Sequence, residues 1–256
     1  MKVFVCVKHV PDTAATIQVR GDNGYEDQGI KFVANPYDEY GMEEAVRLVE
    51  KHGGEVVAVT FGKPEAIATL RGVLAMGAHR GILVKTDGQL VDSITTARAL
   101  KAAIAEDGSP DVIFTGKGAV DSEGFQTQYR LARLLGVPVV NEVSRLEFNG
   151  GRVVAECESD NGEKKIIEFG MPCVIGATKG MNEPRYPKLP DIMKAKKKDV
   201  KELSLADLGV DSGSTKIVLE KLDLVTERSG AKMIPGTVEE QVSELIRILR
   251  ENERVI

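Results

Sequence analysis

The chain has 256 residues and a formal net charge of -5, with a sequence pI near 5.5, which argues against a nucleic-acid-binding protein. No run of about 18 apolar residues occurs, so we expect no direct insertion into a membrane. The first residues lack the apolar core and the small-residue cleavage site of a signal peptide, and we expect a cytoplasmic protein.

Short apolar segments alternate with helical patterns over residues 1–181, which predicts an α/β fold with a Rossmann-like, mostly parallel sheet. The expected core strands are rich in Val and Ile and lie at residues 2–8, 55–61, 81–85, 111–115 and 173–178. Helices are expected near residues 38–52, 64–77, 92–106 and 124–136. The first of these helices has one apolar face, formed by Met42, Ala45, Val46 and Val49.

Two hairpin signals interrupt this alternation. One is an Asn-Gly pair at residues 23–24, and the other is a segment with Asn-Gly pairs at 149–150 and 161–162. The residues that flank the second signal alternate between apolar and polar. We therefore expect an antiparallel hairpin extension on the parallel core.

The regular pattern stops at residue 182. Residues 182–198 read NEPRYPKLPDIMKAKKK, with three prolines and a run of lysines. Residues 199–236 predict no clear element, and a final helix is expected near 238–252, with Thr237 and Glu240 as a capping box. Residues 199–256 have little core of their own, so this segment must pack on its own domain or on another chain.

Few residues in the sequence predict a redox, metal-binding or catalytic site. Cys6, Cys157 and Cys173 lie in strand-like runs without a C-x-x-C pair, as small buried apolar residues do in a reducing compartment. The three histidines fit no zinc-binding spacing, so we expect no metal site. Because the sequence also lacks a P-loop and a G-x-S-x-G motif, we expect no catalytic constellation.

Three loops of the predicted fold favour a nucleotide-binding site. Residues 115–128, TGKGAVDSEGFQTQ, leave a strand, cross a Gly-rich turn and enter a helix, where backbone N–H groups can bind an anion. Residues 60–66 and 33–39 lie at the carboxyl ends of earlier strands. Three such loops at one sheet edge would bind an adenine nucleotide, although plain tight turns give the same pattern.

Five motifs in order resemble those of the β subunit of electron transfer flavoprotein. They are VKHVPD (7–12), NPYDEYGMEEAVRL (35–48), VLAMGAHRGI (73–82), GKGAVDSEGFQTQ (116–128) and NEPRYPKLPDIMKAKKK (182–198). The resemblance covers essentially the whole chain. It implies a heterodimer in which the α subunit holds the redox-active FAD, while the β subunit binds a structural AMP and grips the α subunit with a C-terminal arm.

The resemblance also implies residue roles. The AMP site would comprise Cys6, Val7, Asn35, Phe61, Gly62, Thr115, Gly116, Asp121, Gln126 and Thr127. Thr13 and Tyr37 would face the flavin, although the family often has an aromatic residue at the position of Thr13. Some relatives bind a second FAD in place of AMP and bifurcate electrons. Gln126-Thr127 resembles the AMP-binding form, whereas Phe125 and Gln128-Tyr129 depart from the family pattern.

In the family, the segment 182–198 docks partner dehydrogenases. The resemblance implies a leucine anchor at Leu189, and the docking residues would be Leu189, Pro190, Ile192, Met193, Lys194 and Lys197. One apolar anchor on a stiff, proline-containing segment suits a carrier that must bind and leave. Lys194, Lys196, Lys197 and Lys198 would steer or orient acidic partners. Alternatively, Leu189 is a core residue under a proline turn and the lysines belong to a solvated helix.

The resemblance thus predicts three regions: a nucleotide-binding domain (1–181), a partner-recognition loop (182–198) and an arm that packs on the α subunit (199–256). The predicted function is electron transfer, not catalysis. Electrons would pass from acyl-CoA-type dehydrogenases, through the FAD of the α subunit, to a downstream quinone or iron–sulfur oxidoreductase. Three alternatives are left open: an electron-bifurcating form with a second FAD in place of AMP, a nucleotide-hydrolysing or adenylating enzyme, and a stand-alone adenine-nucleotide-binding module.

Overall fold

In a computed structural model of the chain, the described residues are 1–21, 24–88, 90–158, 161–211, 217, 219–225 and 230–256. They form two units, Met1–Leu222 and Asp223–Ile256. The second unit contains α6 (Val238–Arg247), which continues into a π-helical turn, η3 (Ile248–Asn252). The predicted capping box is present, because the Thr237 side chain accepts from the Glu240 N–H and the Glu240 side chain accepts from the Thr237 N–H.

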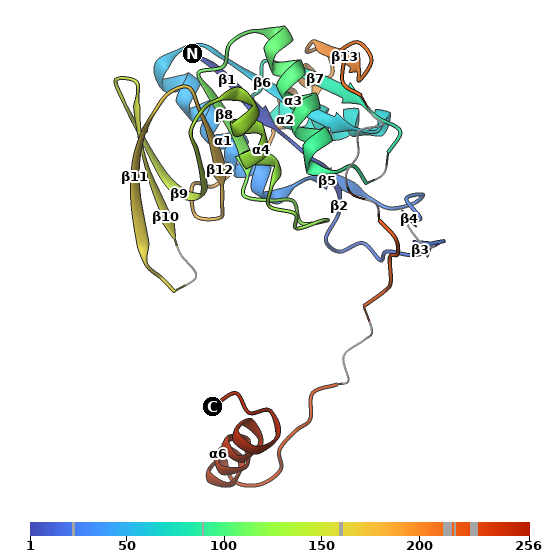
Figure 1. Cartoon of the computed structure of the whole chain (residues 1–256), viewed down its shortest axis with the longest axis vertical. Helices are drawn as coiled ribbons and strands as arrows, with labels where there is room; N and C mark the ends of the chain where they lie inside the picture. The colour runs from blue at the N-terminus through green and yellow to red at the C-terminus, as the bar shows by residue number, and fades with distance from the viewer. Residues whose placement is uncertain (22–23, 89, 159–160, 212–216, 218, 226–229) are drawn as a thin grey trace. The chain divides into compact units, whose positions relative to one another are not determined.

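The first unit is built on a nine-stranded sheet (Figure 1). In spatial order the strands are β11 (Lys164–Gly170), β10 (Arg152–Glu158), β9 (Val139–Asn149), β12 (Cys173–Ala177), β8 (Val112–Gly116), β1 (Lys2–Cys6), β6 (Glu55–Gly62), β7 (Arg80–Lys85) and β13 (Val200–Ser204). Every pair from β9 to β13 is parallel, whereas β10 runs antiparallel to both of its neighbours. The predicted fold class is therefore confirmed.

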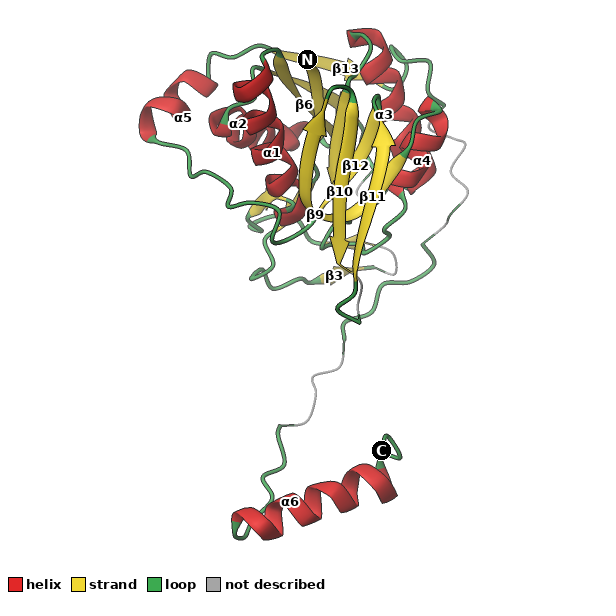
Figure 2. Ribbon diagram, turned by 90° about the vertical axis from the view of Figure 1, so that its left-hand side faces the viewer, coloured by secondary structure: helices red, strands yellow, loops and turns green. Residues whose placement is uncertain are grey.

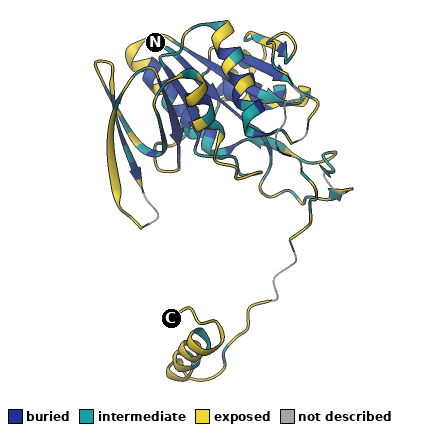
Figure 3. Ribbon diagram, viewed as in Figure 1, coloured by how far each residue is buried: buried dark blue, intermediate teal, exposed yellow. Residues whose placement is uncertain are grey.

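Helices cover both faces of the sheet (Figure 2). On one face lie α1 (Pro36–His52), α2 (Ile67–Met76), which follows a 3-10 turn η1 (Pro64–Ala66), and α5 (Leu189–Ala195). On the opposite face lie α3 (Ser93–Asp107) and α4 (Thr127–Leu135). The central strands are consequently buried on both sides, which explains why their sequences are continuously apolar (Figure 3).

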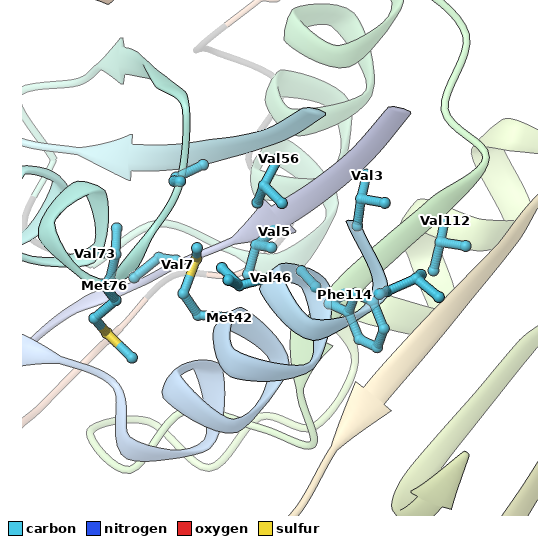
Figure 4. Packing of buried hydrophobic residues seen from close by; sticks show 14 of the residues in the cluster. Val3, Val5, Val7, Met42, Val46, Val56, Val73, Met76, Val112 and Phe114 are labelled. Carbon is cyan, nitrogen blue, oxygen red and sulfur yellow. The ribbon is translucent and has the colours of Figure 1, made fainter. Parts of the chain in front are cut away.

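The two faces have separate apolar cores. In the first core, Met42 and Val46 of α1 pack beside Val5 and Phe114 of the sheet (Figure 4). The second core joins α3 and α4 to the other face and includes Cys6. All three cysteines are free and buried, as predicted, and burial raises the pKa of the Cys6 thiol and raises that of Cys173 to about 12.

The order of the strands places a switch point beside β1. From β1 the chain moves to β6 and β7 on one side, then returns through α3 to β8 on the other side. Helix α1 follows β1 on one face and α4 follows β8 on the opposite face. Ligands of open α/β sheets bind outside the carboxyl ends of the strands at such a point.

Two elements differ from the sequence prediction. β13 lies in a segment where no strand was expected, and its apolar residues, Val200 and Leu203, are too few to give a pattern. The helix expected from residue 124 begins at Thr127, because Glu123 and Phe125 have left-handed backbone conformations, with φ of 44° and 47°. The compact unit accordingly extends through β13 to Leu222.

The hairpins agree with the prediction in broad terms. β9 and β10 are joined by a two-residue turn, Gly150–Gly151, after Asn149, which is the last residue of β9. Asn161 and Gly162 lie in the connection between β10 and β11, next to residues that are outside the described part. Of the pair at 23–24, residue 23 lies outside the described residues, whereas Gly24 belongs to β4 (Gly24–Tyr25), which pairs with β3 (Val19–Arg20).

A second small ribbon lies beside these strands. It pairs β2 (His9–Pro11) with β5 (Phe32–Ala34), and the rings of His9 and Phe32 stack at 4.4 Å between centroids. Among the described residues, no helix has the length and apolar character that crossing a bilayer requires.

Candidate functional site

Asp38 joins three segments at the switch point. Its buried carboxylate accepts hydrogen bonds from the Gly116 N–H at 2.8 Å and the Asn35 side-chain amide at 2.9 Å through Oδ1. Through Oδ2 it accepts from the Lys8 N–H at 2.7 Å. One carboxylate thus connects the chain after β1, the first turn of α1 and the end of β8. Asp38 was not among the predicted site residues, although an acidic residue directly after Asn-Pro-Tyr at a helix start could have indicated it.

Burial dominates the protonation of this carboxyl group. It raises the pKa of Asp38 from an ordinary value of 3.8 to about 7, although the hydrogen bonds from Lys8, Asn35 and Gly116 favour the charged form. Near neutral pH, the protonated and the ionised forms of Asp38 are therefore both populated. The bonds to the two backbone N–H groups are strongest when the group is ionised.

Asn35 holds the Gly-rich loop. Its fully buried side chain donates to the Gly118 carbonyl at 2.9 Å and accepts from the Val120 N–H at 3.1 Å. At the other end of the loop, the buried Gln128 side chain donates to the Lys117 carbonyl at 2.7 Å. The loop is therefore held by two polar side chains, Asn35 at the N-cap of α1 and Gln128 of α4.

Close packing explains two glycines of this loop. A Cβ atom on Gly116 would lie 2.4 Å from Asp38 Oδ1 and 2.7 Å from the Tyr37 Cβ. A Cβ atom on Gly118 would lie 2.4 Å from the Phe125 ring. Both approaches are shorter than van der Waals contact, so only glycine fits. The loop also contains two residues in left-handed backbone conformations, Glu123 and Phe125, which the surrounding contacts must stabilise.

Three of the predicted site residues share one face of the sheet. Cys6, Phe61 and Thr115 lie at the carboxyl ends of the adjacent strands β1, β6 and β8. Cys6 and Phe61 belong to the second core, and alternation along β8 turns Thr115 to the side of Ile113 in that core. The N-terminal end of α4, at Gln126 and Thr127, covers the same face. The structure therefore brings these five predicted residues to one edge.

Unpartnered hydroxyl groups occur at this edge. Among the described residues, the buried side-chain oxygens of Thr95 and Thr115 near this edge have no hydrogen-bond partner. The buried Thr60 hydroxyl also lacks a partner, but alternation along β6 turns it to the opposite face of the sheet. Buried polar groups in proteins are normally paired, so such groups indicate a missing partner. Thr115 lies at the end of β8, and Thr95 lies in the first turn of α3, whose Ser93 hydroxyl is 3.5 Å from Gln126 Oε1.

The remaining predicted residues do not all lie on the face that Cys6, Phe61 and Thr115 share. The Val7 side chain lies in the first core, on the opposite face, and its N–H donates to the Val59 carbonyl at 2.8 Å. The Gly62 carbonyl accepts from the Thr86 N–H at 3.0 Å. Asp121 pairs with the Lys8 ammonium at 2.7 Å, which attaches the Gly-rich loop to the chain after β1.

The two residues expected to face a flavin lie on separate elements. Thr13 is exposed in the turn after β2, and Tyr37 lies half-buried in the first turn of α1. The Lys117 ammonium is 5.3 Å from the centre of the Tyr37 ring, in a cation–π contact.

Comparison with known proteins gives one family. A model of the electron transfer flavoprotein domain matches residues 22–208. The β subunit of electron transfer flavoprotein from Bacillus subtilis is 38% identical over 261 residues, and the alignment covers 100% of both chains. The corresponding subunit from Bradyrhizobium diazoefficiens is 40% identical over 260 residues, with 100% of both chains covered. That from Homo sapiens is 37% identical over 255 residues, with 98% of each covered.

The chain belongs to the electron transfer flavoprotein family. Its full-length similarity is to β subunits, which confirms the resemblance predicted from the five motifs.

In this electron transfer flavoprotein family member, the segment 182–198 presents an apolar surface. Four of its side chains are exposed, and we call them the apolar patch: Tyr186 (95% exposed), Leu189 (73%), Ile192 (42%) and Met193 (55%). Leu189 begins α5, and Pro190 lies in the first turn of that helix. The interpretation of Leu189 as a core residue is therefore wrong, because its side chain points to solvent.

The lysines of the segment do not all have the same environment. Lys194, Lys196 and Lys197 are exposed. Lys198 instead donates to the carbonyls of Leu74 at 2.8 Å and Ala78 at 2.6 Å, at the C-terminal end of α2 and just beyond it. Its charge is used to cap a helix, so it does not belong with the steering lysines.

Proposed function

We propose that this chain is the β subunit of a heterodimeric electron transfer flavoprotein. It accepts electrons from acyl-CoA-type dehydrogenases through an FAD held mainly by the α subunit, and it passes them to a quinone or iron–sulfur oxidoreductase. It is a cytoplasmic carrier subunit without catalytic residues of its own. The observation that carries the proposal is the full-length similarity to β subunits, combined with a polar, glycine-packed sheet edge at the switch point.

The nucleotide at this edge is a structural AMP. Its adenosine would lie against Cys6, Phe61 and Thr115, where buried hydroxyl groups lack partners. Its phosphate would bind at the N-terminal end of α4, where the backbone N–H groups at Gln126 and Thr127 favour an anion. Val7, Asn35, Gly62, Gly116 and Asp121 shape the surrounding backbone. The FAD supplies the redox chemistry when it is bound, and Thr13 and Tyr37 face it from this chain.

The test is the nucleotide content of the heterodimer. The chain is purified with its α subunit, the nucleotides are released with acid, and they are separated by chromatography. One FAD and one AMP per heterodimer are expected. Two FAD without AMP would contradict the proposal and indicate an electron-bifurcating form.

A matched pair of variants tests the AMP residues. Thr115→Val removes one unpartnered hydroxyl group, and we expect AMP to bind about 10-fold more weakly. Thr60→Val removes an equally buried hydroxyl group on the same sheet, but alternation along β6 turns Thr60 to the first core, and we expect no effect on AMP. Equal AMP affinity in both variants would remove Thr115 from the site.

Docking is tested at Leu189. Leu189→Ala is expected to lower the second-order rate of electron acceptance from an acyl-CoA dehydrogenase about 10-fold, because a single apolar anchor carries much of a small interface. The FAD content should not change. Leu134→Ala, at an exposed leucine of α4 on the opposite face, is the control. Equal rates for Leu189→Ala and the unsubstituted protein would exclude the anchor role.

A further inference from the structure

The start of the docking segment is bound to α1 by one arginine. The Arg185 guanidinium donates to Glu43 through Nε at 2.8 Å and Nη2 at 3.1 Å, and to Glu50 through Nη1 at 2.7 Å and Nη2 at 3.1 Å. The Arg185 backbone N–H also donates to Glu43 Oε2 at 3.0 Å. Glu43 and Glu50 lie seven residues apart, two turns along one face of α1, so a planar guanidinium can bridge them.

Glu43 is unusual because it is a buried carboxylate beneath an exposed segment. Its side chain is only 3% exposed, and it also accepts from Arg47 Nε at 2.6 Å. Burial raises its pKa, but the hydrogen bonds from Arg185 and Arg47 outweigh burial and hold the pKa of Glu43 below its ordinary value. A buried carboxylate with this many donors is a fixed point on α1.

Asn182 adds a second contact on the same helix. Its side-chain amide donates to the Tyr40 carbonyl and to Glu44 Oε2, both at 3.0 Å. Residues 182–185 are therefore attached to α1 through side chains at both ends.

The end of the segment is bound to a different helix. Arg71 of α2 donates to the carbonyls of Ala195 at 2.9 Å and Lys198 at 2.5 Å. The Lys198 ammonium returns to the end of α2, and Ala195 is buried against it. The seven-residue helix α5 is thus held between one attachment on α1 and another on α2.

The apolar patch lies between these two attachments. Its four side chains are exposed, so they contribute little packing that could fix their own position. The position of the patch must come from the attachments, because a seven-residue helix is too short to be stable by itself.

We propose that Arg185 and Glu43 are positioning residues for docking: their ion pair holds the apolar patch in the geometry that a dehydrogenase recognises. This inference rests on the proposed docking function. Pre-organisation matters here because ordering a mobile segment at each encounter would weaken a small interface. A role in fold stability alone is the competing explanation, and it makes different predictions.

The test uses Arg185→Lys in the complete heterodimer. Lysine keeps the positive charge but cannot bridge Glu43 and Glu50. We expect the KM for the carrier in reduction by an acyl-CoA dehydrogenase to rise about 10-fold, with an unchanged limiting rate and nucleotide content. The amides of Asp191 and Ile192, which donate to the Lys188 carbonyl, should exchange hydrogen faster, whereas the amides of β1 should not.

Two comparisons separate positioning from stability. Arg152→Lys weakens an exposed ion pair with Glu168 on the hairpin extension and should change neither readout. In the double variant Arg185→Lys, Leu189→Ala, the increase in KM should be less than the product of the two single effects, because both act through the same patch.

The outcomes are distinct. Unchanged exchange at Asp191 and Ile192 in Arg185→Lys would overturn the positioning role whatever the docking rates show. Fully multiplicative effects on KM would overturn it as well. If Leu189→Ala alone leaves KM unchanged while Arg185→Lys speeds hydrogen exchange, the proposed docking function is wrong, and the positioning role for docking is wrong with it. The faster exchange would still show that Arg185 attaches the segment to α1.

Discussion

Helix α1 supports two regions that are built in opposite ways. At its N-terminal end, Asn35 and Asp38 bind the Gly-rich loop with side chains that are buried and paired within the protein. Further along, Glu43 and Glu50 bind a segment whose own apolar side chains face solvent. In the first region the chain shapes an inward-facing edge. In the second it fixes the backbone of a segment whose apolar side chains face solvent.

The difference explains which residue types each region needs. The inward edge needs glycines, because two segments approach more closely than any Cβ atom permits. The outward segment needs charged side chains at its ends, because its apolar patch is exposed and only Ala195 of α5 is buried in the first core. The two regions should therefore respond differently to the same kind of change.

The largest effect is expected from Gly116→Ala. The added Cβ atom would overlap Asp38 and Tyr37, and we expect the free energy of unfolding to fall by about 3 kcal/mol. Chemical denaturation of the variant measures this. Gly72→Ala is the control, because Gly72 is exposed on α2 and a Cβ atom there meets nothing within 4 Å, so alanine should stabilise the protein by up to about 1 kcal/mol. A drop of under 0.5 kcal/mol for Gly116→Ala would show that the edge can relax.

A smaller effect is expected from Lys198→Met. The substitution removes charged hydrogen bonds to the carbonyls of Leu74 and Ala78, and we expect the free energy of unfolding to fall by about 2 kcal/mol. Lys197→Met changes an exposed lysine and should have almost no effect on unfolding. The same denaturation measurement on both variants decides the matter. Equal stability of the two would mean that Lys198 does not attach the segment to α2.

The remaining prediction concerns pH, and the sign of the pH effect should differ between the two regions. The pKa of Asp38 is raised to about 7 by burial, so its contribution to stability decreases as pH rises from about 4 to about 7. The pKa of Glu43 is lowered against the effect of burial by Arg185 and Arg47, so its contribution is present above its ordinary value of 4.5 and is lost as pH falls through the lowered value.

Carboxyl-carbon NMR titration checks this contrast. Asp38 should titrate near neutral pH and Glu43 well below it, with Asp38→Asn and Glu43→Gln used to assign the two signals. Titration of both groups near pH 4 would remove the electrostatic distinction between the two regions.

The periodic parts of the chain were predictable. Strands such as β1 and β8 have continuous apolar sequences because they are buried on both faces, and α1 has its apolar positions on one side. β13 was not predictable, because an edge strand with two apolar residues resembles a loop. The start of α4 was misplaced because tertiary contacts impose left-handed conformations on Glu123 and Phe125 that their residue types do not favour.

The residues of the candidate sites were also only partly predictable from the sequence. Motif resemblance selected Cys6, Phe61 and Thr115, which the strand order then brought to adjacent strand ends on one face. It did not select Asp38, Arg185 or Glu43 for their contacts, because each contact joins residues far apart in the sequence.

The sequence by itself determined the α/β class, the family and the position of the proline-containing segment, because these depend on local periodicity and on motifs read along the chain. Only the tertiary structure decided that one buried carboxylate joins three segments at the switch point of the sheet, and that Lys198 caps α2. It also decided that Arg185 attaches the apolar patch to α1. The reason is physical: a hydrogen bond between distant residues depends on where the whole sheet and its helices place them, and no local pattern records that distance.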